Sequence, residues 1–202
     1  KVYGKYLPFA ILPGNNLYNS LLFHCKYLFE FAMEFVISHK TKVAQMSPDM
    51  KITQVKSNGK SLKNIELPDV MTAIRSGEQA KVVNEHRGIL SSSMPGDRNI
   101  HATDIPVLLF AARFRKKESR IEYQAYNGLV LMDVGNLADR EEAVEVKRLA
   151  SLAPQTVAAF VGSSGKSVKI LVPFVLPDGS LPEKRELAEL FHAVAYRRAV
   201  AF

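Results

Sequence analysis

The sequence has a single cysteine, Cys25, among its 202 residues, and its five histidines are scattered without an i, i+4 pair. One cysteine excludes an intramolecular disulfide framework and a cysteine-rich zinc site, and it fits a reducing compartment, so we predict a cytoplasmic protein. The lack of paired histidines argues against a zinc hydrolase. No Gly-x-Ser-x-Gly motif is present, which removes the usual hydrolase nucleophile elbow.

The sequence also lacks a charge-free hydrophobic run that could cross a bilayer. The most apolar stretch, residues 17–37, contains Lys26, Glu30 and Glu34. Each charge at a bilayer centre costs about 2.5 to 3.5 kcal/mol on insertion scales, so we predict a soluble helix and no membrane partner. We interpret residues 1–45 as an N-terminal helical extension and residues 46–202 as the main domain. We expect this domain to be truncated at its C-terminus, because the helical pattern of its last segment continues up to Phe202.

Hydrophobic residues and positive charge are plentiful. A hydrophobic content of 47% supports a buried core. The chain has 27 Lys plus Arg against 20 Asp plus Glu, a formal net charge of +7, which favours phosphate-bearing partners or acidic surfaces. The most basic stretch contains Arg113, Arg115, Lys116, Lys117 and Arg120. It is either the solvated tip of a hairpin or a contact to a nucleic-acid backbone.

The order of the expected elements indicates the fold class. Hydrophobic patterns predict strands at residues 51–55, 104–114, 120–134 and 156–162 and a further strand that ends at Val175, and helices at 67–75, at 137–154 and after 180. Asn127 and Gly128 indicate a turn or bulge. Asp139 with Glu142, and Ser180 with Glu183, have the spacing of capping boxes. We therefore predict an α+β fold, an RRM-like sheet with helices packed on one face.

The segment GSSGKSVKILV, residues 162–172, contains the Gly-Lys-Ser of phosphate-binding loops. A Walker loop needs a Gly, four residues and then Gly-Lys-Ser or Gly-Lys-Thr, followed by a helix. Here Phe160 stands where the first Gly should be, and an alternating strand follows. The sequence therefore predicts a small turn between two strands, rich in backbone N–H groups, with Lys166 and Lys169 beside it.

The apolar segment LVLMDVGNL, residues 129–137, includes an acid, Asp133, at its strand end. Such an acid projects into the crevice where ligands bind in open sheets. If its strand neighbours the turn of residues 162–172, a metal-binding acid would lie beside a triphosphate cradle, as nucleotidyl transfer requires. A strand-terminal Asp can also be only a helix cap or turn former, and both interpretations stay open.

The runs IPVLLFAARF, YNGLVLMDVGNL, DREEAVEVKRL and TVAAFVGSSGKSVKILVPF resemble the virulence-associated protein E N-terminal-domain family of Bacteroidetes mobile elements, which is placed among archaeo-eukaryotic primase-like domains. The similarity covers about residues 62–202. It implies a domain of a replication protein that binds DNA or RNA, nucleoside triphosphate and a divalent metal, Mg²⁺ or Mn²⁺, next to a C-terminal helicase module. It also implies these roles for single residues: Asp133 as the catalytic, metal-binding acid, Ser164, Gly165 and Lys166 as the phosphate turn, and Lys169 as its terminal cation.

The sequence departs from this family at two positions. Gly135 stands in place of a second acid, and Ser167 replaces the second Gly of the turn; a third acid would lie beyond Phe202. Two-metal chemistry needs carboxylates that hold two cations about 3.5 to 4 Å apart. We therefore predict that this fragment binds nucleotide or nucleic acid and is inactive, while nucleotidyl transfer by a full-length protein stays open. The alternative is a non-catalytic DNA-binding or partner-binding module.

Overall fold

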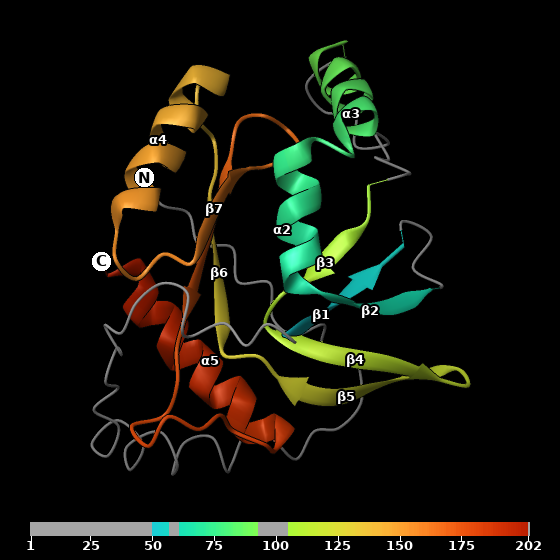
Figure 1. Cartoon of the computed structure of the whole chain (residues 1–202), viewed down its shortest axis with the longest axis vertical. Coiled ribbons are helices and arrows are strands. Elements are labelled where there is room, and N and C mark those ends of the chain that lie inside the picture. Colours follow the sequence, from blue (N-terminus) through green and yellow to red (C-terminus); the bar gives the residue numbers. More distant parts are fainter. Residues whose placement is uncertain (1–49, 57–60, 93–104, 202) are drawn as a thin grey trace.

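The computed structural model describes residues 50–56, 61–92 and 105–201 (Figure 1). The expected extension, residues 1–45, lies outside them. Within the described ranges the chain forms four helices and eight strands, in the order β1 (Lys51–Val55), β2 (Leu62–Glu66), α2 (Leu67–Ser76), α3 (Ala80–Ser92), β3 (Val107–Leu109), β4 (Ala112–Lys117), β5 (Arg120–Tyr126), β6 (Leu129–Val134), α4 (Arg140–Leu152), β7 (Ala158–Val161), β8 (Val168–Pro173) and α5 (Arg185–Val200). The predicted α+β class is confirmed.

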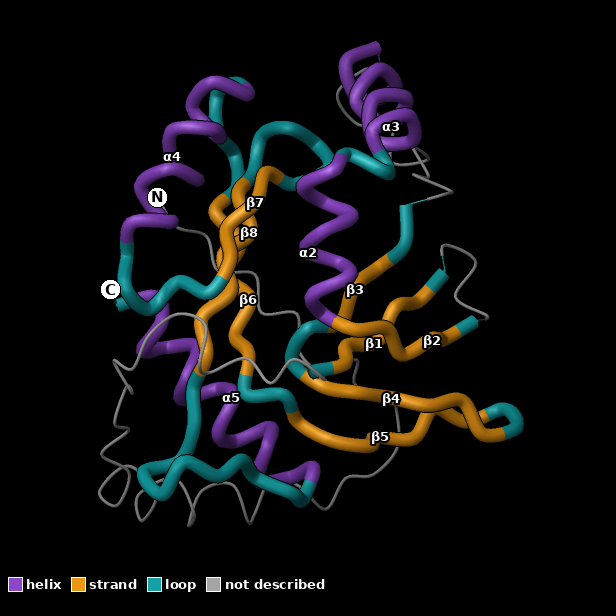
Figure 2. Tube along the Cα trace, in the orientation of Figure 1, coloured by secondary structure: helices purple, strands orange, loops and turns teal. Residues whose placement is uncertain are grey.

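The strands are divided among three small antiparallel sheets (Figure 2). Their strand orders are β2-β1-β3, β4-β5 and β6-β8-β7. The single strand expected at residues 104–114 is two strands in the structure, because the chain leaves β3 at Phe110 and enters the second sheet at Ala112. The third sheet carries the acid and the turn singled out above.

One face of the β6-β8-β7 sheet packs against α4 and α5. Val130, Val168 and Val172 point into a core that also contains Ala143 of α4 and Phe191 of α5. Both helices lie on the same side of the sheet in Figure 1. This layer agrees with the predicted α+β class, whereas the expected single RRM-like sheet is divided into three sheets in the structure.

The opposite face is covered as well. Leu129 and Leu171, which alternate with the residues of the first core, pack against Ile52 of β1 and Leu67 of α2. Helix α2 matches its expected range, with Pro68 in the first turn and a left-handed Gly77 as its C-cap. The β6-β8-β7 sheet is therefore a central layer with apolar cores on both sides.

Helix caps follow the sequence in one case and not in the other. The Asp139 carboxylate accepts the Glu142 N–H (2.8 Å), and the Glu142 carboxylate accepts the Ala138 N–H (2.6 Å), so the expected cap of α4 is confirmed. The expected cap of α5 by Ser180 is wrong. Its hydroxyl and its N–H both bond the Asp178 carboxylate (2.7 and 2.9 Å), an Asx turn, and the helix begins only at Arg185.

The junction between β5 and β6 carries the chain from the second sheet to the third, at the predicted turn. Asn127 is only 8% exposed. Its side-chain Nδ2 donates to the carbonyls of Lys51 (2.9 Å) and Phe110 (3.0 Å), and its backbone N–H donates to Ala111 (2.8 Å). Gly128 follows with φ +68°. One buried amide thus connects segments of all three sheets.

Candidate functional site

Asp133 and Lys169 face each other across two neighbouring strands. The register of β6 and β8 pairs them directly, and the Lys169 ammonium donates to the Asp133 carboxylate in an ion pair. The side chains stay 53% exposed for Asp133 and 28% exposed for Lys169. Exposed pairs of this kind contribute only about 0–1 kcal/mol, so a stronger charged ligand can separate them.

The turn of residues 162–167 lies at the same end of the sheet as Asp133, because β8 starts from it and runs antiparallel to β6. Gly162 N–H donates to the Ser167 carbonyl (2.8 Å), and Gly165, at φ +79°, donates to the Gly162 carbonyl (3.0 Å). A Cβ on Gly162 would lie 2.2 Å from Ser167 Oγ. The serine is therefore accommodated because glycine stands opposite it.

Ser164 and Lys166 form the outer part of this turn. The Lys166 N–H donates to Ser164 Oγ (3.2 Å) while its side chain is exposed. The Lys166 carbonyl accepts the Leu137 N–H (3.2 Å), which ties the turn to the loop before α4. Within the described part of the chain, the N–H groups of Ser163 and Ser164 have no hydrogen-bond partner. They are donors that an anion can use.

Arg87 of α3 is part of this site, although no sequence motif marks it. Its Nε donates to the Ser163 carbonyl (3.1 Å) and its Nη2 to the Gly162 carbonyl (3.4 Å). Partial burial, and secondarily the charge of Arg140 at the start of α4, lower the pKa of Arg87. The turn is thus bordered by cations from two helices as well as by its own lysines.

The donor set does not fit a two-metal centre. Asp133 contributes one carboxylate, which Lys169 already engages, and Gly135 contributes none. Across residues 50–56, 61–92 and 105–201, no group of three or more His, Cys, Asp or Glu side chains is placed to hold a metal ion. Any cation at Asp133 would need its other ligands from water or from a bound molecule.

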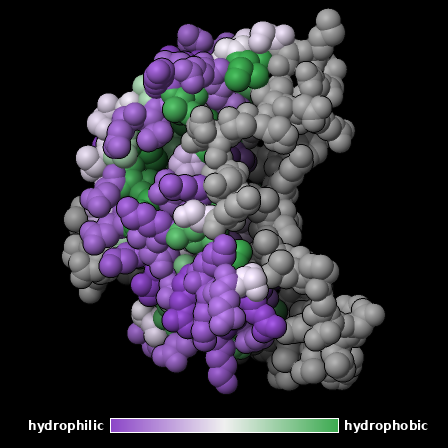
Figure 3. Space-filling view, turned by 90° about the vertical axis from the view of Figure 1, so that its right-hand side faces the viewer, coloured by the Kyte–Doolittle hydropathy of each residue, from purple (hydrophilic) through white to green (hydrophobic). Residues whose placement is uncertain are grey.

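The β4–β5 hairpin lies far from the turn, at the other end of the molecule in Figure 1. The side chains of Arg115, Lys116, Lys117 and Arg120 are exposed, and that of Arg113 is half-buried. Figure 3, which looks onto this side, shows hydrophilic surface gathered at the projecting tip. The structure therefore does not bring the basic hairpin and the turn into one site.

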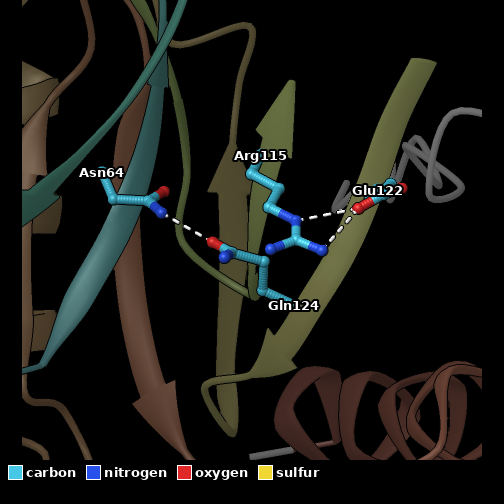
Figure 4. Close-up of polar contacts among 4 residues, drawn as sticks. All are labelled: Asn64, Arg115, Glu122 and Gln124. Atoms are coloured by element: carbon cyan, nitrogen blue, oxygen red, sulfur yellow. Dashed lines mark hydrogen bonds and ion pairs between the residues drawn. The ribbon is translucent and has the colours of Figure 1, made fainter. Parts of the chain in front are cut away.

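Polar side chains hold the base of the hairpin against β1 and β2. The Phe114 N–H donates to Thr53 Oγ1 (2.8 Å), and the Thr53 hydroxyl donates to Asn64 Oδ1 (2.8 Å). Asn64 Nδ2 then donates to Gln124 Oε1 (2.7 Å), as Figure 4 shows. Thr53 is completely buried, so this chain of hydrogen bonds gives the hairpin a fixed direction.

One cation of the hairpin is already paired within the chain. Arg115 donates through Nε (2.8 Å) and Nη2 (2.7 Å) to Glu122 Oε2, directly across the two strands (Figure 4). Lys117 and Arg120, which face each other at the tip, form no ion pair with any described residue. They are the hairpin cations best placed to contact an external anion.

These features define an α+β domain in which an acid–lysine pair and a cation-bordered turn share one end of a sheet. The family model described as BT4734-like, N-terminal domain, matches residues 101–202, and the chain belongs to this family. No curated protein and no solved structure matches the sequence. None of the described helices is both long and apolar enough to cross a membrane.

Proposed function

We propose that this chain is a domain of the primase-polymerase type, from a mobile-element replication protein, that binds nucleoside triphosphate and nucleic acid. The observation that carries the proposal is the position of Asp133, Lys169 and the turn of residues 162–167 at one end of the β6-β8-β7 sheet. Ammonium groups and unpaired backbone N–H groups are the donors that bind phosphate oxygens. Nucleotidyl transfer in a longer protein, beside a helicase module, belongs to the same proposal.

In this proposal Asp133 would hold Mg²⁺ or Mn²⁺ together with phosphate oxygens of the nucleotide, since one carboxylate plus substrate phosphates is a common ligand set for Mg²⁺. Lys169 would then contact phosphate in place of Asp133. The exchange is inexpensive because the ion pair is solvent-exposed. One carboxylate does not form a two-metal centre, so the proposal for this chain is binding rather than catalysis.

The change Asp133→Asn gives opposite results with and without divalent metal. In Mg²⁺, the variant is expected to bind ATP about tenfold more weakly, a loss of about 1.4 kcal/mol, because the metal loses its protein ligand. In EDTA, it is expected to bind ATP at least as tightly as the wild type, because a negative charge is gone and Lys169 is released. Isothermal titration calorimetry at constant ionic strength measures both.

Two further variants complete this experiment. Lys166→Gln is expected to weaken ATP binding in both buffers, since its charge acts on phosphate directly. Arg148→Gln, which removes a charge that Glu145 pairs on α4, is expected to change neither. Unchanged affinity in both Asp133→Asn and Lys166→Gln would refute the site, whereas equal affinities of Asp133→Asn and wild type in Mg²⁺ would refute the role of the metal alone.

A second candidate function, binding of DNA by the hairpin without catalysis, is favoured by the fixed direction and exposed cations of β4–β5. Phosphate contacts release counterions, and each one contributes about 0.9 to the slope of log K against log salt concentration for duplex DNA. The double change Lys117→Gln with Arg120→Gln is therefore expected to make this slope about 1.8 less steep. Fluorescence anisotropy of a labelled duplex over a salt series measures it.

The Arg148→Gln variant is the control here as well, because it removes one positive charge from another face of the molecule and is expected to keep the wild-type slope. A slope that stays the same in the double variant would show that the hairpin tip does not contact the DNA backbone. An equal decrease in the slope for Arg148→Gln would indicate an unspecific effect of net charge.

A further inference from the structure

We propose that Arg87 and Arg140, together with Lys166, bind the phosphate chain of a nucleoside triphosphate. This inference rests on the proposed function and deepens it, because it adds two residues from α3 and α4 to the turn. The three cations come from separate parts of the chain, α3, α4 and the turn between β7 and β8.

Arg87 carries a charge without a counter-charge in the described structure. Its guanidinium bonds only the carbonyls of Gly162 and Ser163, and among the described carboxylates none forms an ion pair with it. The side chain is half-buried, and its Nε lies 3.3 Å from the position of a Cβ on Gly165. A partly buried charge is costly unless an opposite charge accompanies it. The arrangement therefore favours an anionic ligand.

Arg140 is a second cation at the same place. It is the first residue of α4, and the hydrogen bond from Leu137 to Lys166 holds the start of that helix against the turn. Arg140 is exposed and makes no ion pair with a described residue. Burial is the main cause that lowers the pKa of Arg87, and the positive charge of Arg140 lowers it further. Two neighbouring positive charges repel each other, and an anion bound near both adds attractions that offset this repulsion.

The acids at the start of α4 form no ion pair with these three cations. The carboxylates of Asp139 and Glu142 are bonded to backbone N–H groups, as the cap requires, and Glu141 forms no ion pair with a described residue. A guanidinium binds phosphate oxygens through two parallel N–H groups, which an ammonium cannot do. Several cations on converging elements suit a compact chain of phosphates, the ligand class that the proposed function names.

The test uses inorganic tripolyphosphate, ATP and a single-stranded DNA oligonucleotide without a terminal phosphate, each titrated in EDTA at constant ionic strength. Arg140→Gln and Arg87→Gln are expected to bind tripolyphosphate about tenfold more weakly than the wild type. Arg87→Lys keeps the charge but loses the two parallel N–H groups of the guanidinium. Its affinity for tripolyphosphate is therefore expected to lie between that of the glutamine variants and that of the wild type. Arg148→Gln is the matched control, on the same helix about 12 Å further along its axis.

Arg140→Gln keeps the test independent of folding, because the Arg140 side chain is exposed and forms no hydrogen bond or ion pair with a described residue. The melting temperature of this variant is expected to equal that of the wild type. If Arg87→Gln and Arg140→Gln both bind tripolyphosphate with wild-type affinity, the inference is overturned. The proposed function still holds in that case if Lys166→Gln weakens ATP binding. The inference is also overturned if Arg87→Gln and Arg140→Gln weaken binding of the oligonucleotide but not of tripolyphosphate or ATP. If both arginines matter for tripolyphosphate but ATP binds no more tightly than tripolyphosphate, the inference stands and the nucleotide specificity fails.

Discussion

Replacing Gly128 by alanine is expected to destabilise the protein by about 2–5 kcal/mol. Gly128 has φ +68°, and a side chain in the left-handed region costs roughly 1–2 kcal/mol. The added Cβ would also lie 2.6 Å from the Phe174 carbonyl oxygen and 2.6 Å from Leu181 Cδ2. Overpacking of this kind typically costs about 1–3 kcal/mol more. Urea denaturation followed by circular dichroism measures the loss.

The steric part of this effect is large because the backbone cannot move aside. The Phe174 N–H donates to the Gly128 carbonyl (2.7 Å) where β6 begins and β8 has just ended. Gly179→Ala is the matched control, since Gly179 has φ +82° and nothing within 4 Å of the added Cβ. It is expected to cost only the roughly 1–2 kcal/mol of the backbone strain. Equal losses in the two variants would contradict the clash at Gly128.

Phe191→Ala is expected to lower the free energy of unfolding by about 3–5 kcal/mol, the usual cost of removing a buried phenyl ring. Phe191 is completely buried on α5. Its ring meets the Tyr126 ring edge to face, with centroids 5.7 Å apart, and the Tyr126 hydroxyl bonds His192 Nδ1 (3.0 Å). The alanine would leave a cavity between α5 and the central sheet, which denaturation curves would report as an earlier midpoint.

Leu187→Ala provides the comparison on the same helix. Leu187 lies one turn earlier and is 42% exposed, and leucine and alanine have similar helix propensities. Its replacement is expected to cost less than about 1 kcal/mol. If the two variants were equally destabilised, the helix itself rather than the buried ring would carry the stability of this core.

Local patterns predicted much of this fold. The cap of α4 depends on residues within one helical turn, and the Asn127–Gly128 junction depends on two adjacent residues. Both features can therefore be predicted from a short stretch of sequence. The strand ending in Asp133 and the turn of residues 162–167 were expected to neighbour each other, and the register of β6 with β8 shows that they do. Whether these residues have the roles that the family resemblance implies stays a prediction.

Contacts between distant parts of the chain were not predictable in the same way. Helix α3 has no buried residue, so no stripe of core residues marks it in the sequence, and we predicted no helix there. Arg87 belongs to the site because it donates to carbonyls that lie 75 and 76 residues further along the chain. The division into three sheets depends on which strands pair with each other. The alternation of polar and apolar residues within one strand does not determine its partner strand.

The buried amide of Asn127 bears on where this folding unit starts. The family match begins at residue 101, yet Asn127 takes one of its carbonyl partners from Lys51, and Leu129 and Leu171 are shielded by Ile52 and Leu67. A fragment cut at residue 101 would remove the Lys51 acceptor of the Asn127 amide and expose Leu129 and Leu171 to water. Expression trials should therefore retain β1 and α2.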